Sequence, residues 1–226
     1  KTAMIFDTHA HYDDEQFDAD REALLSGMKA GGVGMIGDAA ATVASWDKIL
    51  ELTEKYPFDF VIGSNHLLGG EDPYYRELFK TKKDTDAYRQ AFQETIENIG
   101  KVESFDVLGH LDYIVRYGTH QAEEYSYQKF SDEVDAILKK IISMGKGIEM
   151  NMAGLKYGLG FPNPHPDVLR RYRELGGEIV TIGADAHSPE FVAYDFEKAE
   201  SILSGCGFSY YAEFQGRKPS FKRIVP

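Results

Sequence analysis

Two histidines in the segment Asp7-Thr8-His9-Ala10-His11 have the spacing of paired metal ligands. Residues two apart point to the same face of a β-strand, so His9 and His11 can both face one ion. Imidazole is a common ligand for zinc, iron and related ions. A single motif of this kind is weak evidence, because one packed histidine beside one exposed histidine gives the same pattern.

The placement of the other histidines strengthens the metal interpretation. Five of the seven stand at or just after the end of a short apolar or β-rich segment: His9, His11, His66, His110 and His187. Asp112, Glu149 and Asp185 stand at strand ends in the same way. Imidazole mixed with carboxylate favours Zn, Mn or Fe over an all-oxygen site for Ca. We therefore expect one to three divalent ions, held by these histidines with Glu149 and Asp185.

Arg116 and Asp112 are the candidate catalytic residues near this set. Arg116 follows His110 in the next loop, where a guanidinium could hold a substrate phosphate through two parallel hydrogen bonds. The alternative is a surface arginine paired with a nearby acid. His120 and His165 lie in loops away from strand ends, and we expect neither to be a ligand.

Short apolar segments and helical patterns alternate along the chain. The predicted strands cover residues 4–6, 33–37, 58–63, 105–109, 147–148 and 178–183, with 208–214 as a seventh strand and 221–225 as an extension. The predicted helices cover residues 18–30, 42–56, 84–99, 131–144, 166–175 and 196–203. This alternation is typical of a parallel α/β sheet. Because polar residues follow so many strands, we expect one domain over residues 1–226, a distorted or incomplete TIM-like barrel of about seven parallel strands.

Composition and charge restrict the partners of the protein. The formal net charge of -12 and the lack of a basic stripe argue against a broad nucleic-acid surface. No apolar run approaches the roughly 20 residues of a membrane span, and we see no signal-peptide layout. A lone cysteine, Cys206, fits a reducing compartment. We expect a cytoplasmic protein whose ligand is a small phosphorylated substrate or inorganic phosphate; the sequence leaves its oligomeric state open.

From about residue 56 onward, the chain resembles histidinol-phosphate phosphatases of the PHP (polymerase and histidinol phosphatase) superfamily. The matching segments are 58–66, 109–118, 147–151, 157–160, 183–187 and 217–219. Residues 4 to about 57 instead resemble the start of TatD-type metal-dependent deoxyribonucleases, on the strength of segments 4–14 and 38–46. Both families are metal hydrolases built on β/α barrels. The change near Tyr56-Pro57-Phe58 suggests a natural or engineered chimera of segments 1–57 and 58–226.

The resemblance also implies a division of the ligands. It would place one ion at His9, His11 and Asp185, a second at His66 and His110, and part of a third at His187. A PHP phosphatase would also carry a T-D-H and a G-x-E strand end before His66, and both are missing here. The absent glutamate would have bridged two ions, so a weaker or smaller metal site is expected.

Three functions follow from these observations. The first is a phosphomonoesterase of the histidinol-phosphatase type, which uses water activated by metal ions. The second is a recombined barrel that binds metal or phosphate with little or no turnover. The third is a TatD-like deoxyribonuclease, which the acidic charge and the absence of that family's later motifs oppose.

Overall fold

The fold is known from a computed structural model, which describes residues 5–10, 19, 21–27, 33–40, 51, 55–186 and 194–224. For residues 5–10 and 33–40 it describes the backbone alone. The predicted ligands His11 and His187, and most of the helix predicted over 42–56, lie outside the described residues.

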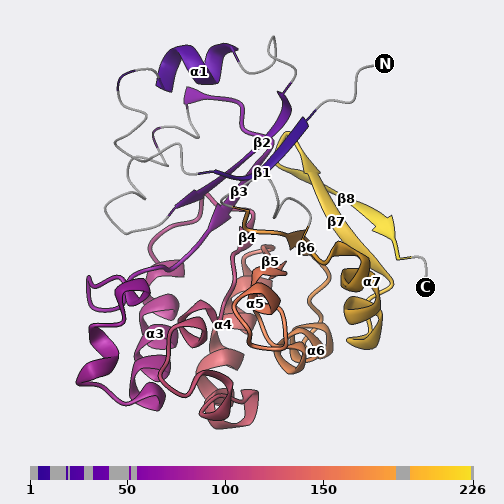
Figure 1. The fold of residues 1–226 in the computed structure, drawn as a ribbon. Coiled ribbons are helices and arrows are strands. Elements are labelled where there is room, and N and C mark those ends of the chain that lie inside the picture. Colours follow the sequence, from indigo (N-terminus) through magenta and orange to yellow (C-terminus); the bar gives the residue numbers. More distant parts are fainter. Residues whose placement is uncertain are drawn as a thin grey trace.

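Six strands form one parallel sheet in chain order (Figure 1). They are β1 (Ile5–Ala10), β2 (Val33–Ala40), β3 (Phe60–Gly63), β4 (Val107–Leu108), β5 (Gly147–Asn151) and β6 (Val180–Gly183). Each strand pairs with the next in parallel, and β2 pairs with β3 from Gly37 opposite Phe60 to Ala40 opposite Gly63. The parallel α/β sheet expected from the alternating pattern is therefore confirmed.

The last two strands depart from the prediction. Strands β7 (Tyr210–Gln215) and β8 (Lys218–Arg223) form a separate antiparallel hairpin, so the expected seventh parallel strand is wrong. The physical reason lies in the turn, where Gly216 and Arg217 both have a positive φ that reverses the chain. Every residue of β8 is exposed, as expected for the outer strand of a hairpin.

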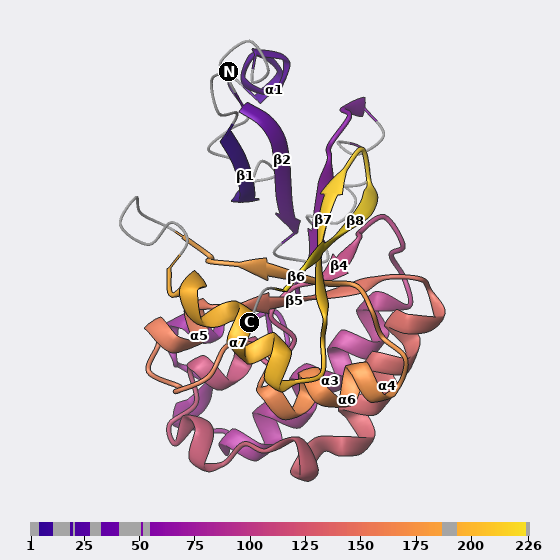
Figure 2. The ribbon, with the colours of Figure 1, turned by 90° about the vertical axis from the view of Figure 1, so that its right-hand side faces the viewer.

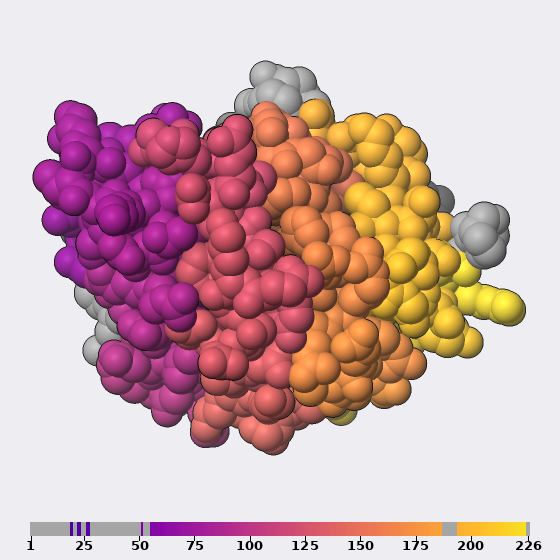
Figure 3. All heavy atoms as spheres, turned by 90° about the horizontal axis from the view of Figure 1, so that it is seen from below, coloured from indigo at the N-terminus to yellow at the C-terminus, as the bar shows by residue number. Residues whose placement is uncertain are grey.

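Helices cover one face of the sheet (Figures 1 and 2). They are α3 (Asp84–Ile99), α4 (Ser131–Ser143), α6 (Pro166–Glu174) and α7 (Phe196–Gly205). Two α-helices are short: α5 (Ala153–Lys156), and α1 (Arg21–Gly27), which lies apart from this layer. Seen from the helical side, the segments follow one another across the surface in chain order (Figure 3). This is the arrangement that repeated strand–helix units produce.

Two apolar clusters hold the sheet in place. The larger lies between the sheet and the helices, where Ile137, Leu138 and Ile141 of α4 are fully buried. Their spacing puts them on one face of the helix, which explains why this segment forms a helix packed on the sheet. The smaller cluster lies on the opposite face of the sheet, where Phe60 of β3 stacks on Phe214 of β7 at 4.8 Å between ring centroids. The hairpin therefore packs against the inner face of the sheet.

None of the described helices is both long enough and apolar enough to span a membrane.

Candidate functional site

The first component of the site is a pair of histidines at the ends of adjacent strands. His66 follows β3 and His110 follows β4, and these two strands pair in parallel. Their Nε2 atoms lie 2.9 Å apart, and the ring of Tyr113 lies 4.8 Å from each imidazole centroid. The side chain of His110 is buried, while that of His66 is half-buried. The sequence placed both residues at strand ends, and the structure brings them together.

Glu149 of β5 forms the second component, directly beside the histidine pair. Its Oε2 accepts hydrogen bonds from the backbone N–H of His110 and from Nδ2 of Asn151, each at 3.1 Å. Its Oε1 is buried and has no hydrogen-bond partner among the described residues. A Cβ at position 183 would overlap this oxygen, so Gly183 is required for the carboxylate to lie here. Burial, and the nearby negative charge of Asp185, raise the pKa of Glu149 to about 7.

Arg116 forms the third component and lies at the centre of a buried hydrogen-bond network. Its side chain is 1% exposed. Nε donates to Asn163 Oδ1 at 2.7 Å, Nη1 to Asp185 Oδ2 at 2.8 Å and Nη2 to Asn151 Oδ1 at 2.9 Å. The guanidinium carbon also lies 5.1 Å from the ring centroids of two tyrosines, Tyr113 and Tyr157. Hydrogen bonding on three nitrogens fixes the plane of the guanidinium.

Asp112 is connected to this network through Asn163. Its Oδ1 accepts from Asn163 Nδ2 at 2.6 Å, and its Oδ2 accepts from the backbone N–H of His165 at 2.8 Å. The side chain is fully buried, and burial raises the pKa of its carboxyl group. The contacts of Asp112 are thus with the loop that carries Asn163, and through that loop with Arg116.

Asp185 is held in an uncommon backbone conformation. Its φ is +52°, a left-handed conformation that residues other than glycine adopt at a cost on the order of 1 kcal/mol. Its contacts with described residues include the ion pair with Arg116 and a hydrogen bond at 3.3 Å from Lys156 Nζ to its backbone oxygen. Backbone strain of this kind clusters at functional sites, which is consistent with the predicted role of Asp185 as a ligand.

The predicted site residues are therefore partly assembled. The structure brings the side chains of His66 and His110 together, bonds Glu149 to the backbone N–H of His110, and joins Asp185 to Arg116. His9 lies on β1, where the backbone alone is described, whereas His11 and His187 lie outside the described residues. Within the described part of the chain, no three His, Cys, Asp or Glu side chains come close enough to hold an ion. His120 and His165, expected to be non-ligands, each lie within 4 Å of an aspartate, Asp84 and Asp167.

The donor chemistry of the histidine pair suits a divalent metal ion. Two imidazole nitrogens bound to one tetrahedral zinc ion would lie about 3.3 Å apart, given Zn–N distances of about 2.0–2.1 Å. The 2.9 Å between His66 Nε2 and His110 Nε2 is close to that separation. The pair supplies two of the four ligands that such an ion needs. The residues present therefore fit a metal ion, with further ligands to come from outside the pair.

Sequence reasoning did not identify the two asparagines of the network. Asn151 and Asn163 bond to Arg116 through their side chains, and their backbones also pair with each other at 2.7 and 2.9 Å. A signal was present at Asn163, which stands between Pro162 and Pro164 in a segment rigid enough to position a side chain.

Comparison with known proteins identifies the family. A model of the PHP domain matches residues 7–153, so the chain belongs to the PHP domain family. The match spans Tyr56-Pro57-Phe58, where the sequence suggested a junction between two families. That junction and the TatD-like origin of residues 1–57 stay predictions.

Two curated relatives are both named as histidinol-phosphatases. A probable histidinol-phosphatase from Clostridium acetobutylicum is 34% identical over 155 residues, which are 69% of this chain and 60% of the relative. A histidinol-phosphatase from Lactococcus lactis is 28% identical over 177 residues, or 76% of this chain and 64% of the relative. The chain thus spans somewhat less than two thirds of the length of these proteins.

A solved structure shares the fold. It is a histidinol phosphate phosphatase from Lactococcus lactis, crystallised with zinc, L-histidinol and phosphate. The two structures superpose with a TM-score of 0.69 at 24% sequence identity. The superposition covers 91% of this chain and 78% of the Lactococcus lactis chain. This likeness supports the arrangement of strands and helices described above.

Proposed function

We propose that this chain is a metal-dependent phosphomonoesterase that acts on L-histidinol phosphate. The observation that carries the proposal is the pair of facing Nε2 atoms of His66 and His110, with the carboxylate of Glu149 bonded to the backbone of His110. Membership of the PHP family and the names of the relatives support the reaction and the substrate.

In this proposal His66 and His110 bind a divalent metal ion, and Glu149 and Asp185 contribute carboxylates beside them. His9, His11 and His187 remain the proposed further ligands from the sequence. A bound ion of this kind supplies Lewis-acid activation of the phosphate ester and of the attacking water. Zinc, manganese and iron all suit the mixture of imidazole and carboxylate.

The role proposed for Arg116 changes with the structure. The sequence left two roles open for Arg116: a clamp for the substrate phosphate, or a surface arginine paired with an acid. In the structure Arg116 is paired with an acid, Asp185, but it is buried and not on the surface. We propose that Arg116 orients Asp185 and that Asp112, through Asn163, orients Arg116. The hydrogen bonds described use three of the five N–H groups of Arg116, which leaves two for the proposed contact with the substrate phosphate.

The test is phosphate release by the purified chain loaded in turn with Zn, Mn or Fe. We expect L-histidinol phosphate to be hydrolysed with a kcat/KM at least about tenfold above that for phosphoserine, and a chelator to abolish turnover. The same preparation is assayed on single-stranded DNA. Stoichiometric metal without phosphate release would favour the inactive barrel, and DNA cleavage faster than phosphate release would overturn the proposal in favour of a nuclease.

A further inference from the structure

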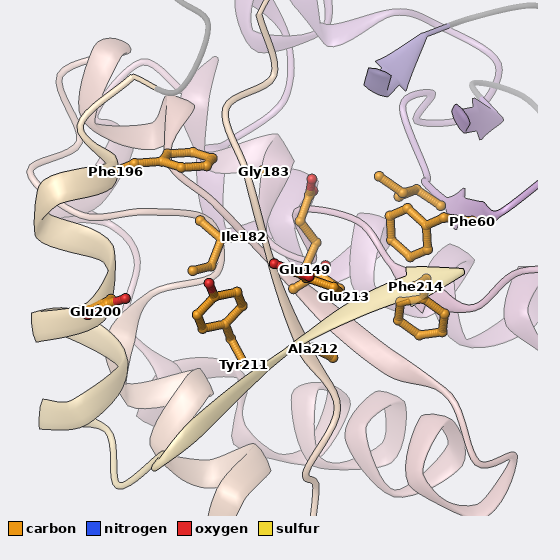
Figure 4. A pocket seen from close by; sticks show the side chains of 12 residues that line it. Phe60, Glu149, Ile182, Gly183, Phe196, Glu200, Tyr211, Ala212, Glu213 and Phe214 are labelled. Carbon is orange, nitrogen blue, oxygen red and sulfur yellow. The ribbon is translucent and has the colours of Figure 1, made fainter. Parts of the chain in front are cut away.

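A pocket of about 320 Å³ lies between the inner face of the sheet, strand β7 and helix α7 (Figure 4). Its volume is at the small end of the range for ligand sites. Twelve described residues line it, and all but Glu149 lie apart from the histidine pair and from the hydrogen-bond network of Arg116. Glu149 is the exception that connects the two regions, because its Oε2 faces His110 while the residue also lines the pocket.

The described lining of the pocket is acidic. Among the described residues that line it, three are glutamates, Glu149, Glu200 and Glu213, and none is Lys, Arg or His. Burial raises the pKa of the Tyr211 phenol, and the negative charges of Glu213 and Glu200 raise it further. Tyr211 therefore shares this acidic part of the pocket with both glutamates. Among the described residues, Glu213 pairs with Lys222 at 3.4 Å, and that lysine is about half exposed to solvent. A positively charged group in the pocket would therefore be attracted by the carboxylates of Glu200 and Glu213, and by Glu149 in its ionised form.

Two buried polar atoms of the pocket have no hydrogen-bond partner among the described residues. They are Oε1 of Glu149, on a side chain that is 1% exposed, and Oγ1 of Thr181, on a residue that is 7% exposed. A buried polar atom without a partner costs about 1–3 kcal/mol, so such atoms are rare and their presence in a cavity points to a ligand. Both atoms can accept a hydrogen bond.

Aromatic and aliphatic side chains complete the walls. Phe60 and Phe214 stack on each other at one side, and Phe196 of α7 and Tyr211 of β7 lie at the other (Figure 4). Such walls suit an apolar body, while the carboxylates and the unpartnered oxygens suit a group with positive charge and N–H donors.

We propose that this pocket binds a small organic cation, a primary ammonium group carried on a short apolar or aromatic body. A primary ammonium has three N–H donors for Glu149 Oε1, Thr181 Oγ1 and the carboxylate of Glu213. The pocket shares Glu149 with the proposed metal site, but the inference does not rest on the proposed phosphatase activity, because its test measures equilibrium binding and not turnover.

The test is isothermal titration calorimetry of the purified chain with phenethylammonium chloride and, as its neutral counterpart, 2-phenylethanol. We expect saturable binding of the ammonium at least about tenfold tighter than that of the alcohol, since the two share the apolar body and differ in charge. Equal affinities, or no saturable binding of the ammonium, would overturn the proposal.

Variants locate the binding. Glu213→Gln removes one charge from a half-buried side chain and is expected to weaken phenethylammonium binding about threefold. Thr181→Val keeps the shape of the side chain and removes the unpartnered oxygen, with a similar or larger loss. Glu174→Gln, on the exposed surface of α6, is the matched control and should leave the affinity unchanged. If neither Glu213→Gln nor Thr181→Val weakens binding, the ammonium binds elsewhere and the assignment is wrong. Phosphate release is not used as a readout, so failure here leaves the proposed function untouched.

Discussion

Nη1 of Arg116 lies 2.8 Å from Oδ2 of Asp185, and both side chains are almost completely buried. The two residues are 69 positions apart, one in the 3-10 helix Tyr113–Arg116 and the other just after β6. A buried ion pair is stable only if hydrogen bonds satisfy the remaining polar atoms. Asn151 and Asn163 supply two of those hydrogen bonds. The network therefore makes the position of Asp185 dependent on Arg116.

Replacing Arg116 with lysine tests this dependence. Lysine keeps the positive charge but cannot reach Asn163, Asp185 and Asn151 together, so buried oxygens lose their partners. We expect Arg116→Lys to lower the free energy of unfolding by about 2–4 kcal/mol, measured by urea denaturation. Arg170→Lys, on the exposed side of α6, is the matched control and should have little effect. An Arg116→Lys protein as stable as the parent would show that the network contributes nothing to stability.

Gly183 is a position where the site leaves no room for a side chain. A Cβ there would overlap Oε1 of Glu149, so Gly183→Ala is expected to cost about 1–3 kcal/mol of unfolding free energy. The cost should fall when Glu149 is replaced by alanine as well, because the overlap is then removed. Gly205→Ala, where a Cβ meets nothing within 4 Å, is the control and should be neutral. Equal costs of Gly183→Ala in both backgrounds would contradict the overlap.

The acid sensitivity of the fold can be predicted from the contact between α4 and α6. Two hydrogen bonds from Arg171, at 2.9 and 2.7 Å, hold the pKa of Asp135 well below its usual range. A carboxyl group whose pKa is lower in the folded state stabilises the fold above its unfolded pKa of about 3.9, and this stabilisation is lost as the pH falls towards the folded value. The stability difference between the parent and Asp135→Asn should therefore be largest near neutral pH and shrink below about pH 4, in urea denaturation at several pH values. A difference that stays constant, or grows in acid, would show that Asp135 acts in another way.

The sequence predicted those parts of the molecule that depend on local periodicity. The helix over 84–99 has the predicted bounds, and the histidines at the ends of β3 and β4 meet as expected. The helix follows from the apolar periodicity of its own segment. The histidines meet because each follows a strand, and parallel strands place their ends at one edge of the sheet.

The parts that sequence reasoning missed depend on distant contacts. The antiparallel hairpin looked like a seventh parallel strand, because an apolar segment carries no information about the direction of its partner. The bond from Arg116 to Asn163 joins residues 47 positions apart, and an arginine after a strand end gives no sign that it is buried. For the hairpin, Gly216 was a local signal of the chain reversal, since glycine favours the positive φ found there.

The measurement that tests the central claim most directly is kcat/KM for L-histidinol phosphate in histidine variants of the metal-loaded chain. We expect His110→Ala and His66→Ala each to lower kcat/KM by about 100-fold or more and to bind less metal, because each removes an imidazole from the pair. His120→Ala, whose side chain is 60% exposed and lies apart from the pair, should retain the parent activity. Activity that survives in folded His110→Ala and His66→Ala proteins, or falls equally in His120→Ala, would contradict the assignment of the site.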